Sequence, residues 1–96
     1  MQDTAFVFPD TATVEVVERT DHPLTGILVQ YKVTFPNGYT GSVVQGRYTY
    51  GGPQGLWELA VVRDGQVVYD TPITDDVLGW LTESQVIEVL RAIEAL

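Results

Sequence analysis

The chain contains no cysteine and only one histidine, His22, among its 96 residues. Without cysteine there is no disulfide, no thiolate metal site and no cysteine nucleophile. A single histidine also excludes any site built from several histidines, and His22 precedes Pro23 in a sequence typical of an exposed turn. The sequence therefore predicts no cofactor and excludes many common catalytic schemes.

Basic residues are scarce as well. Five lysines and arginines stand against 13 aspartates and glutamates, which gives a formal net charge of −8. Binding to DNA or RNA through the phosphates requires a basic patch, so we expect no direct nucleic-acid binding. The same charge speeds encounter with a basic protein partner. It also promotes solubility, so acidity by itself does not identify a partner.

Long apolar runs are missing from the sequence. None approaches the roughly 20 residues that a membrane-spanning helix needs. Residues 1–10 have no basic segment, and their apolar stretch is too short for a signal peptide. We therefore expect no membrane association and a cytoplasmic location.

The composition predicts a folded protein, because 45% of the residues are hydrophobic and 10% are aromatic. A chain of 96 residues is long enough to bury one core. We expect a single domain over residues 1–96. Residues 1–10 are expected to form a loose N-terminal arm, because Pro9 lacks a backbone donor.

Alternating hydrophobicity predicts β-strands over most of the chain, and the alternation is clearest over 27–35. Pro36-Asn37-Gly38 favours a tight turn, and Asp64-Gly65 favours a second one, so both predict antiparallel hairpins. Gly41 and Gly46 indicate a bulge or a close backbone approach. The expected strands are 12–19, 27–35, 39–50, 56–63 and 66–69.

The hydrophobic period changes from two residues to about three and a half near the C-terminus. Thr82-Glu83-Ser84-Gln85 matches a capping box, which predicts that a helix begins there. One stripe of this helix is apolar. We therefore expect an α+β domain in two layers, with an antiparallel meander of four to five strands packed against a C-terminal amphipathic helix. The stripe comprises Val86, Val89, Leu90, Ile93 and Leu96.

Three aspartates lie in the junction between sheet and helix, residues 69–82. Clustered carboxylates could bind Mg²⁺ or Ca²⁺ or act as acid and base, so a small metal-assisted hydrolase is an alternative function. The preferred interpretation is structural: Thr74 caps a short helix that begins at Asp75, and the carboxylates lie at the positive end of its dipole. Trp80 and Leu81 are expected to anchor the junction against the core. The aspartates are Asp70, Asp75 and Asp76.

Aromatic and arginine side chains surround the glycine-rich loop 51–55. This loop joins two expected strands and has no following lysine, so it lacks the features of a phosphate-binding loop. Such side chains are enriched at protein interfaces. Alternation places Tyr48 and Tyr50 on the face opposite Arg47, and we expect part of the group in the core. The candidate partner-binding residues are Arg47, Tyr48, Tyr50, Trp57, Asp70, Asp75 and Asp76.

Two segments of the chain, YGGPQGLWELAV at 50–61 and YDTPITDDVLGWLT at 69–82, resemble small uncharacterised proteins encoded by bacteriophages and prophages. The resemblance covers about the last half of the chain and implies no catalytic residues. It implies an accessory factor that binds a host protein.

The leading hypothesis is therefore a non-enzymatic, acidic binding protein of phage or prophage origin, located in the host cytoplasm. It could mask a basic, nucleic-acid-binding surface of its host partner. A virion structural or assembly component is a further alternative, and the sequence leaves the oligomeric state open.

Overall fold

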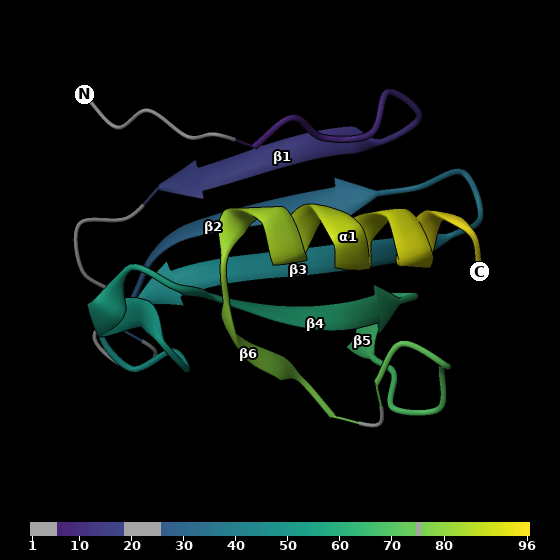
Figure 1. The fold of residues 1–96 in the computed structure, drawn as a ribbon. Coiled ribbons are helices and arrows are strands. Elements are labelled where there is room, and N and C mark those ends of the chain that lie inside the picture. The colour runs from purple at the N-terminus through teal and green to yellow at the C-terminus, as the bar shows by residue number, and fades with distance from the viewer. Residues whose placement is uncertain (1–5, 19–25, 75) are drawn as a thin grey trace.

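The computed structural model describes residues 6–18, 26–74 and 76–96. These residues form a six-stranded antiparallel sheet and one C-terminal helix (Figure 1). The expected α+β class, with an antiparallel sheet followed by a helix, is confirmed. The elements are β1 (Thr13–Glu18), β2 (Ile27–Thr34), β3 (Tyr39–Gly46), the 3-10 helix η1 (Gly52–Gln54), β4 (Trp57–Arg63), β5 (Gln66–Val67), β6 (Leu78–Leu81) and α1 (Glu83–Glu94).

Strands β1 to β4 follow one another in the sheet as they do in the sequence. The far edge of β4 is shared by two strands, because β5 pairs with its C-terminal end and β6 with its N-terminal end. Both predicted hairpins are present, β2 with β3 and β4 with β5. The close approach expected at Gly41 is also present, since a Cβ there would lie 2.5 Å from Leu90 Cδ2.

The junction before α1 differs from the expectation. Residues 78–81 form strand β6, and no helix is present among the described residues 69–74 and 76–81. The Thr74 hydroxyl accepts a hydrogen bond from Asp76 N at 3.0 Å, which makes a local turn and not a helix cap. The helix prediction was wrong because residues 78–81 pair with the N-terminal end of β4, and this tertiary pairing overrides the local preference for a helix.

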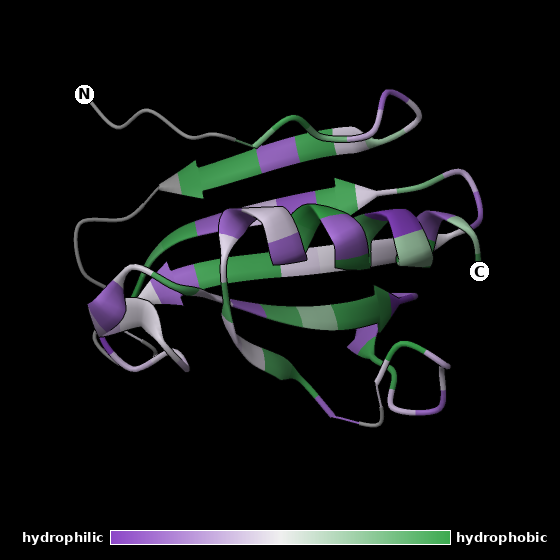
Figure 2. Cartoon of the chain, viewed as in Figure 1, coloured by the Kyte–Doolittle hydropathy of each residue, from purple (hydrophilic) through white to green (hydrophobic). Residues whose placement is uncertain are grey.

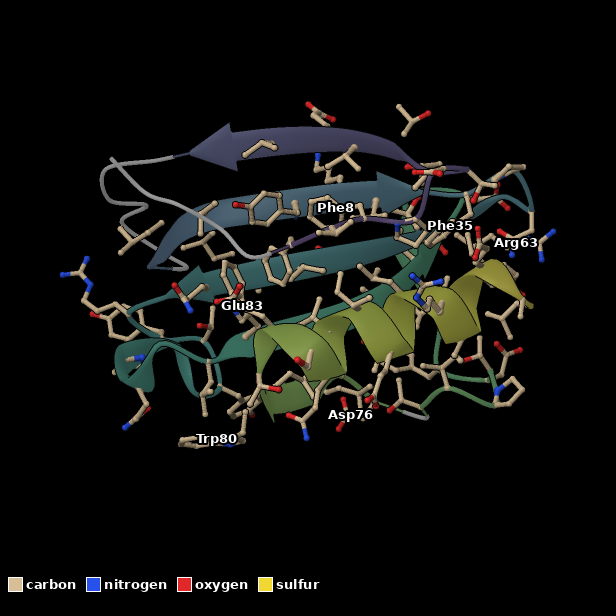
Figure 3. The ribbon with its side chains drawn as sticks, turned by 45° about the horizontal axis from the view of Figure 1, so that its top comes forward. Phe8, Phe35, Arg63, Asp76, Trp80 and Glu83 are labelled. Carbon is tan, nitrogen blue, oxygen red and sulfur yellow. The ribbon has the colours of Figure 1, made fainter. Side chains whose placement is uncertain are left out.

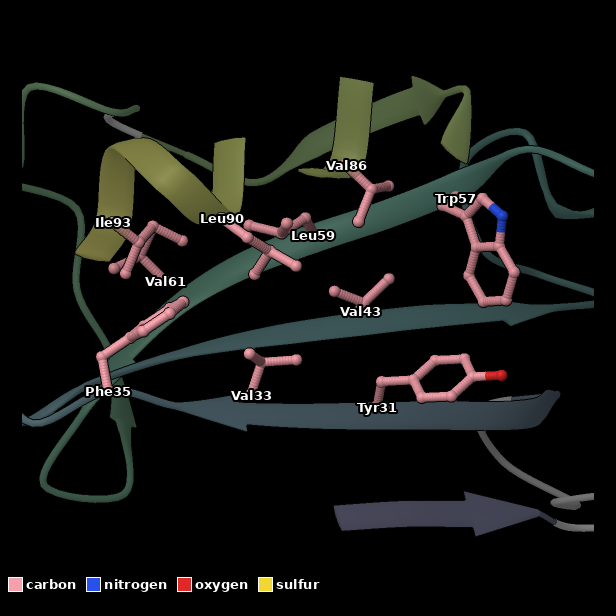
Figure 4. Close-up of a cluster of buried hydrophobic side chains, with 10 residues drawn as sticks. All are labelled: Tyr31, Val33, Phe35, Val43, Trp57, Leu59, Val61, Val86, Leu90 and Ile93. Carbon is pink, nitrogen blue, oxygen red and sulfur yellow. The ribbon is translucent and has the colours of Figure 1, made fainter. Parts of the chain in front are cut away.

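The core lies between the sheet and α1, whose residues Val86, Leu90 and Ile93 are fully buried (Figure 4). Figure 2 shows hydrophobic residues in β1 to β4. The remainder of the core comes from β2, β3 and β4 and from Phe35, which directly follows β2, whereas β1 adds only the partly buried Val14. The buried cluster comprises Tyr31, Val33, Phe35, Val43, Trp57, Leu59, Val61, Val86, Leu90 and Ile93.

The N-terminal segment covers the part of this face that α1 leaves open. Phe6 packs against Tyr31 and Trp57, with ring centroids 5.3 and 4.9 Å apart, and Phe8 lies 5.4 Å from Tyr31. The described part of the expected loose arm, residues 6–10, is therefore packed against the core. Its two phenylalanines account for this, because they alternate across an exposed valine and both face the sheet.

Both ends of α1 are held by side chains. At its start, Gln85 N donates to Thr82 Oγ1 and Thr82 N donates to Gln85 Oε1, so the predicted capping box is confirmed. At its end, Asn37 Nδ2 donates to the carbonyl oxygens of Ile93 and Glu94 at 2.8 and 3.2 Å. The turn between β2 and β3 is thereby joined to the C-terminus of the helix.

Candidate functional site

The aromatic residues near the glycine-rich loop divide between core and surface. Trp57 is only 5% exposed, and its ring packs against Phe6 and Tyr31. It shares the covered face of the sheet with Leu59 and Val61, because β4 keeps regular alternation. Trp57 is therefore a core residue and does not belong to a partner-binding surface. Tyr48 and Tyr50 are 68% and 58% exposed.

Arg47 and Tyr48 lie in the loop between β3 and η1, where the structure brings them together. The Arg47 guanidinium carbon is 5.4 Å from the centroid of the Tyr48 ring. The sequence alternation placed them on opposite faces, but β3 ends at Gly46, so strand geometry no longer applies to either residue. Both side chains are exposed.

The loop that carries these residues is fixed by close backbone packing. The buried Thr49 hydroxyl accepts from Gly46 N at 2.9 Å and donates to Gly46 O at 3.1 Å. A Cβ at Gly46 would overlap with the Gly26 carbonyl oxygen, and one at Gly52 would overlap with the Gly46 carbonyl oxygen. Tyr48 and Tyr50 are therefore presented on a tightly packed turn, which reduces the entropy lost on binding.

Trp80 was expected to pack against the core, but it is exposed. It is 58% exposed, and Figure 3 shows its side chain at the margin of the molecule, directed away from sheet and helix. Its φ of 60° is left-handed, which is rare for a bulky residue. Leu81 pairs with Trp57 and Leu78 with Leu59, so two residues of β6 face one of β4 in a bulge.

The bulge changes the direction of Trp80. Regular alternation cannot place Leu78 and Leu81 on one face, because they are three positions apart. Their spacing, together with Gly79 before Trp80, is the sequence signal that could have predicted the bulge. The expected anchoring of the junction by Trp80 was thus wrong, whereas its neighbour Leu81 does pack against the core.

Tyr50 and Trp80, here called the exposed aromatic pair, each pack against the glycine that neighbours the other residue. A Cβ at Gly79 would lie 2.5 Å from Tyr50 Cβ, and a Cβ at Gly51 would lie 3.2 Å from Trp80 Cε3. Each aromatic side chain thus covers the glycine beside the other one. Trp80 N also donates to Tyr50 O at 3.2 Å, which joins the two segments directly.

A carboxylate lies next to the exposed aromatic pair. Tyr50 N donates to Glu58 Oε1 at 3.0 Å, and Glu58 is the β4 residue opposite the bulge. Asp70 and Asp76 are exposed, and Asp76 Oδ1 accepts from Val77 N at 2.8 Å. Asp75 and His22 lie outside the described residues. Within the described part of the chain, no three acidic or histidine side chains gather as a metal site.

Comparisons with protein-family models, with curated proteins and with solved structures found no match. The site is therefore assigned from its own geometry. Among the helices in the described ranges, none is both long and apolar enough to cross a bilayer.

The uncovered face of the sheet holds a second, polar surface with a hollow of about 510 Å³. Two cross-strand side-chain pairs lie on it: Gln30 Nε2 donates to Ser42 Oγ at 3.0 Å, and the Thr34 and Thr40 hydroxyls are 3.0 Å apart. Such cross-strand pairs are typical of a solvated sheet face. The hollow is lined by Thr13, Glu15, Gln30, Lys32, Thr34, Thr40, Ser42, Val62, Gly65 and Val67.

Proposed function

We propose that the protein is a non-enzymatic accessory protein of phage or prophage origin that binds a host protein through the surface formed by Arg47, Tyr48 and the exposed aromatic pair. The exposure of Trp80 in a left-handed conformation carries the proposal. Strained residues gather at functional sites, where the surrounding structure maintains them. Exposed tryptophan, tyrosine and arginine are also the side chains that contribute most to binding energy at protein interfaces.

The net charge of −8 supports a partner with a basic surface. Glu58 places one of the acidic groups at the Tyr50 backbone, within the proposed surface. A host protein that uses a basic surface to bind nucleic acid fits this charge, and the protein would mask that surface. The two-layer scaffold, with an amphipathic helix covering the sheet, would hold the binding residues in place.

Affinity capture from a bacterial host lysate tests the proposal, followed by affinity measurements with the purified partner. The variant Tyr50→Ser/Trp80→Gly removes both aromatic side chains, and glycine accepts the positive φ at position 80. We expect the affinity to fall at least about 30-fold, because truncating an interface hot spot costs about 2 kcal/mol or more.

The matched control is Tyr69→Ser. Tyr69 is 55% exposed but follows β5, which pairs with the opposite end of β4 from β6. This variant should bind the partner with unchanged affinity. Equal losses in the two variants, or full binding by the double variant, would contradict the proposed surface.

A further inference from the structure

We infer that the exposed aromatic pair binds an arginine side chain of the partner, with the Glu58 carboxylate beside its guanidinium group; this inference rests on the proposed function. An arginine guanidinium is planar and stacks on the faces of tryptophan and tyrosine, and Trp is the strongest such acceptor. Both residues of the pair are more than half exposed to solvent, so a partner can reach them.

The chain itself uses this contact twice. The Arg63 guanidinium carbon lies 4.9 Å from the Tyr39 ring centroid, and Arg47 lies 5.4 Å from that of Tyr48. Neither contact involves the exposed aromatic pair. Among the described residues, no arginine lies over the ring of Tyr50 or Trp80. The exposed rings of Tyr50 and Trp80 are therefore accessible to a cation from outside.

The local charge favours a cation over a neutral side chain. Glu58 Oε1 accepts from Tyr50 N, so this carboxylate is held next to the Tyr50 backbone. Arginine donors form stronger hydrogen bonds with carboxylates than with neutral acceptors. The bond from Tyr50 N uses only part of the acceptor capacity of the Glu58 carboxylate, so an arginine can bind there as well. An aromatic face and a carboxylate together match the two binding modes of a guanidinium group.

The probe is the acetylated peptide Gly-Arg-Gly-Arg-Gly, compared with the same peptide in which neutral citrulline replaces each arginine. Binding is followed by the indole N–H resonance of Trp80 in ¹⁵N-labelled protein, with the buried Trp57 as an internal reference. We expect the arginine peptide to shift the Trp80 resonance and to bind about three- to tenfold more tightly than the citrulline peptide.

Two variants separate local recognition from attraction by net charge. Glu58→Gln keeps an acceptor for Tyr50 N but removes the charge, so it should weaken binding of the arginine peptide and leave the citrulline peptide unaffected. Tyr50→Ser/Trp80→Gly keeps the net charge and with it the non-local attraction, but it should reduce the difference between the peptides. If the double variant prefers the arginine peptide as strongly as the unchanged protein does, the attraction is entirely non-local and the inference fails.

Equal binding of the two peptides, or an unshifted Trp80 resonance at saturation, would also overturn the inference. If the purified partner still requires Tyr50 and Trp80 in that case, the proposed function stands without the arginine contact. If instead the partner binds the double variant normally, the proposed function fails, whatever the peptides do.

Discussion

Trp80 shows how a single residue can depart from its intrinsic preferences. A left-handed conformation costs an L-residue about 1–2 kcal/mol, and exposing an indole ring forfeits burial of its apolar surface. Tyr50 packs against Gly79 and Trp80 packs against Gly51, and neither glycine position leaves room for a side chain. These contacts hold Trp80 in its left-handed conformation. The strained residue thus lies within the proposed binding surface.

Replacing Trp80 by glycine and by alanine should separate strain from packing. Both variants lose the same ring, but only glycine accepts a φ of 60° without cost. We expect Trp80→Gly to have a free energy of unfolding about 1 kcal/mol higher than Trp80→Ala, measured by urea denaturation.

The exposed Lys32 in β2 is the control position, because its backbone is that of a regular strand. There the order should reverse, with the glycine variant about 0.5–1 kcal/mol less stable than the alanine variant. The same order at both positions would contradict the strain at Trp80.

Elements are joined in this fold by side chains at their ends. Asn37 connects the turn between β2 and β3 with the end of α1, because its amide donates to helix carbonyls while its Oδ1 accepts from Tyr39 N at 3.0 Å. The turn was predicted from Pro36-Asn37-Gly38, but its role at the helix end involves residues 56 or more positions away. Local sequence contains no signal for such a contact.

Asn37→Asp should separate the two roles of this side chain. Aspartate keeps the acceptor for Tyr39 N but loses the donors to α1, and it places a negative charge at the negative end of the helix dipole. We expect a loss of about 1–3 kcal/mol in the free energy of unfolding.

Gln54→Glu in η1 controls for the added charge, because Gln54 is exposed and lies outside α1. It should change stability by less than about 0.5 kcal/mol. If the two variants are equally stable in urea, the link between turn and helix contributes nothing.

At the scale of the whole molecule, charge is the dominant feature. A net charge of −8 on 96 residues produces self-repulsion in the compact state, which salt screens over a Debye length of about 10 Å at 0.1 M. The same screening weakens attraction to a basic partner. Stability and partner affinity should therefore respond to salt in opposite directions.

Raising NaCl from about 20 to 200 mM should increase the free energy of unfolding by several tenths of a kcal/mol up to about 1 kcal/mol, as measured in urea. The affinity for the captured partner should fall over the same range. Asp70→Asn/Asp76→Asn neutralises two exposed acids and should reduce both responses. A stability that falls with added salt would contradict the repulsion argument.

Elements with complete local signals could be predicted from the sequence. The hairpin turns at 36–38 and 64–65, the capping box at Thr82 and the alternation of 27–35 each depend only on neighbouring residues. Strand β6 has no complete local signal, because its four residues do not alternate regularly and they form a strand by pairing with β4. The local prediction for the junction was a short helix beginning at Asp75, and the pairing of residues 78–81 with β4 overrode it.

The two tryptophans mark the limit of what the sequence by itself determined. It specified a β-rich domain that ends in a capped helix, and it pointed to the aromatic residues around the glycine loop. Only the tertiary structure decided that Trp57 is buried under Phe6 while Trp80 is exposed. Burial depends on which distant segment covers each face of the sheet, and the bulge that directs Trp80 outward exists only where β6 meets β4.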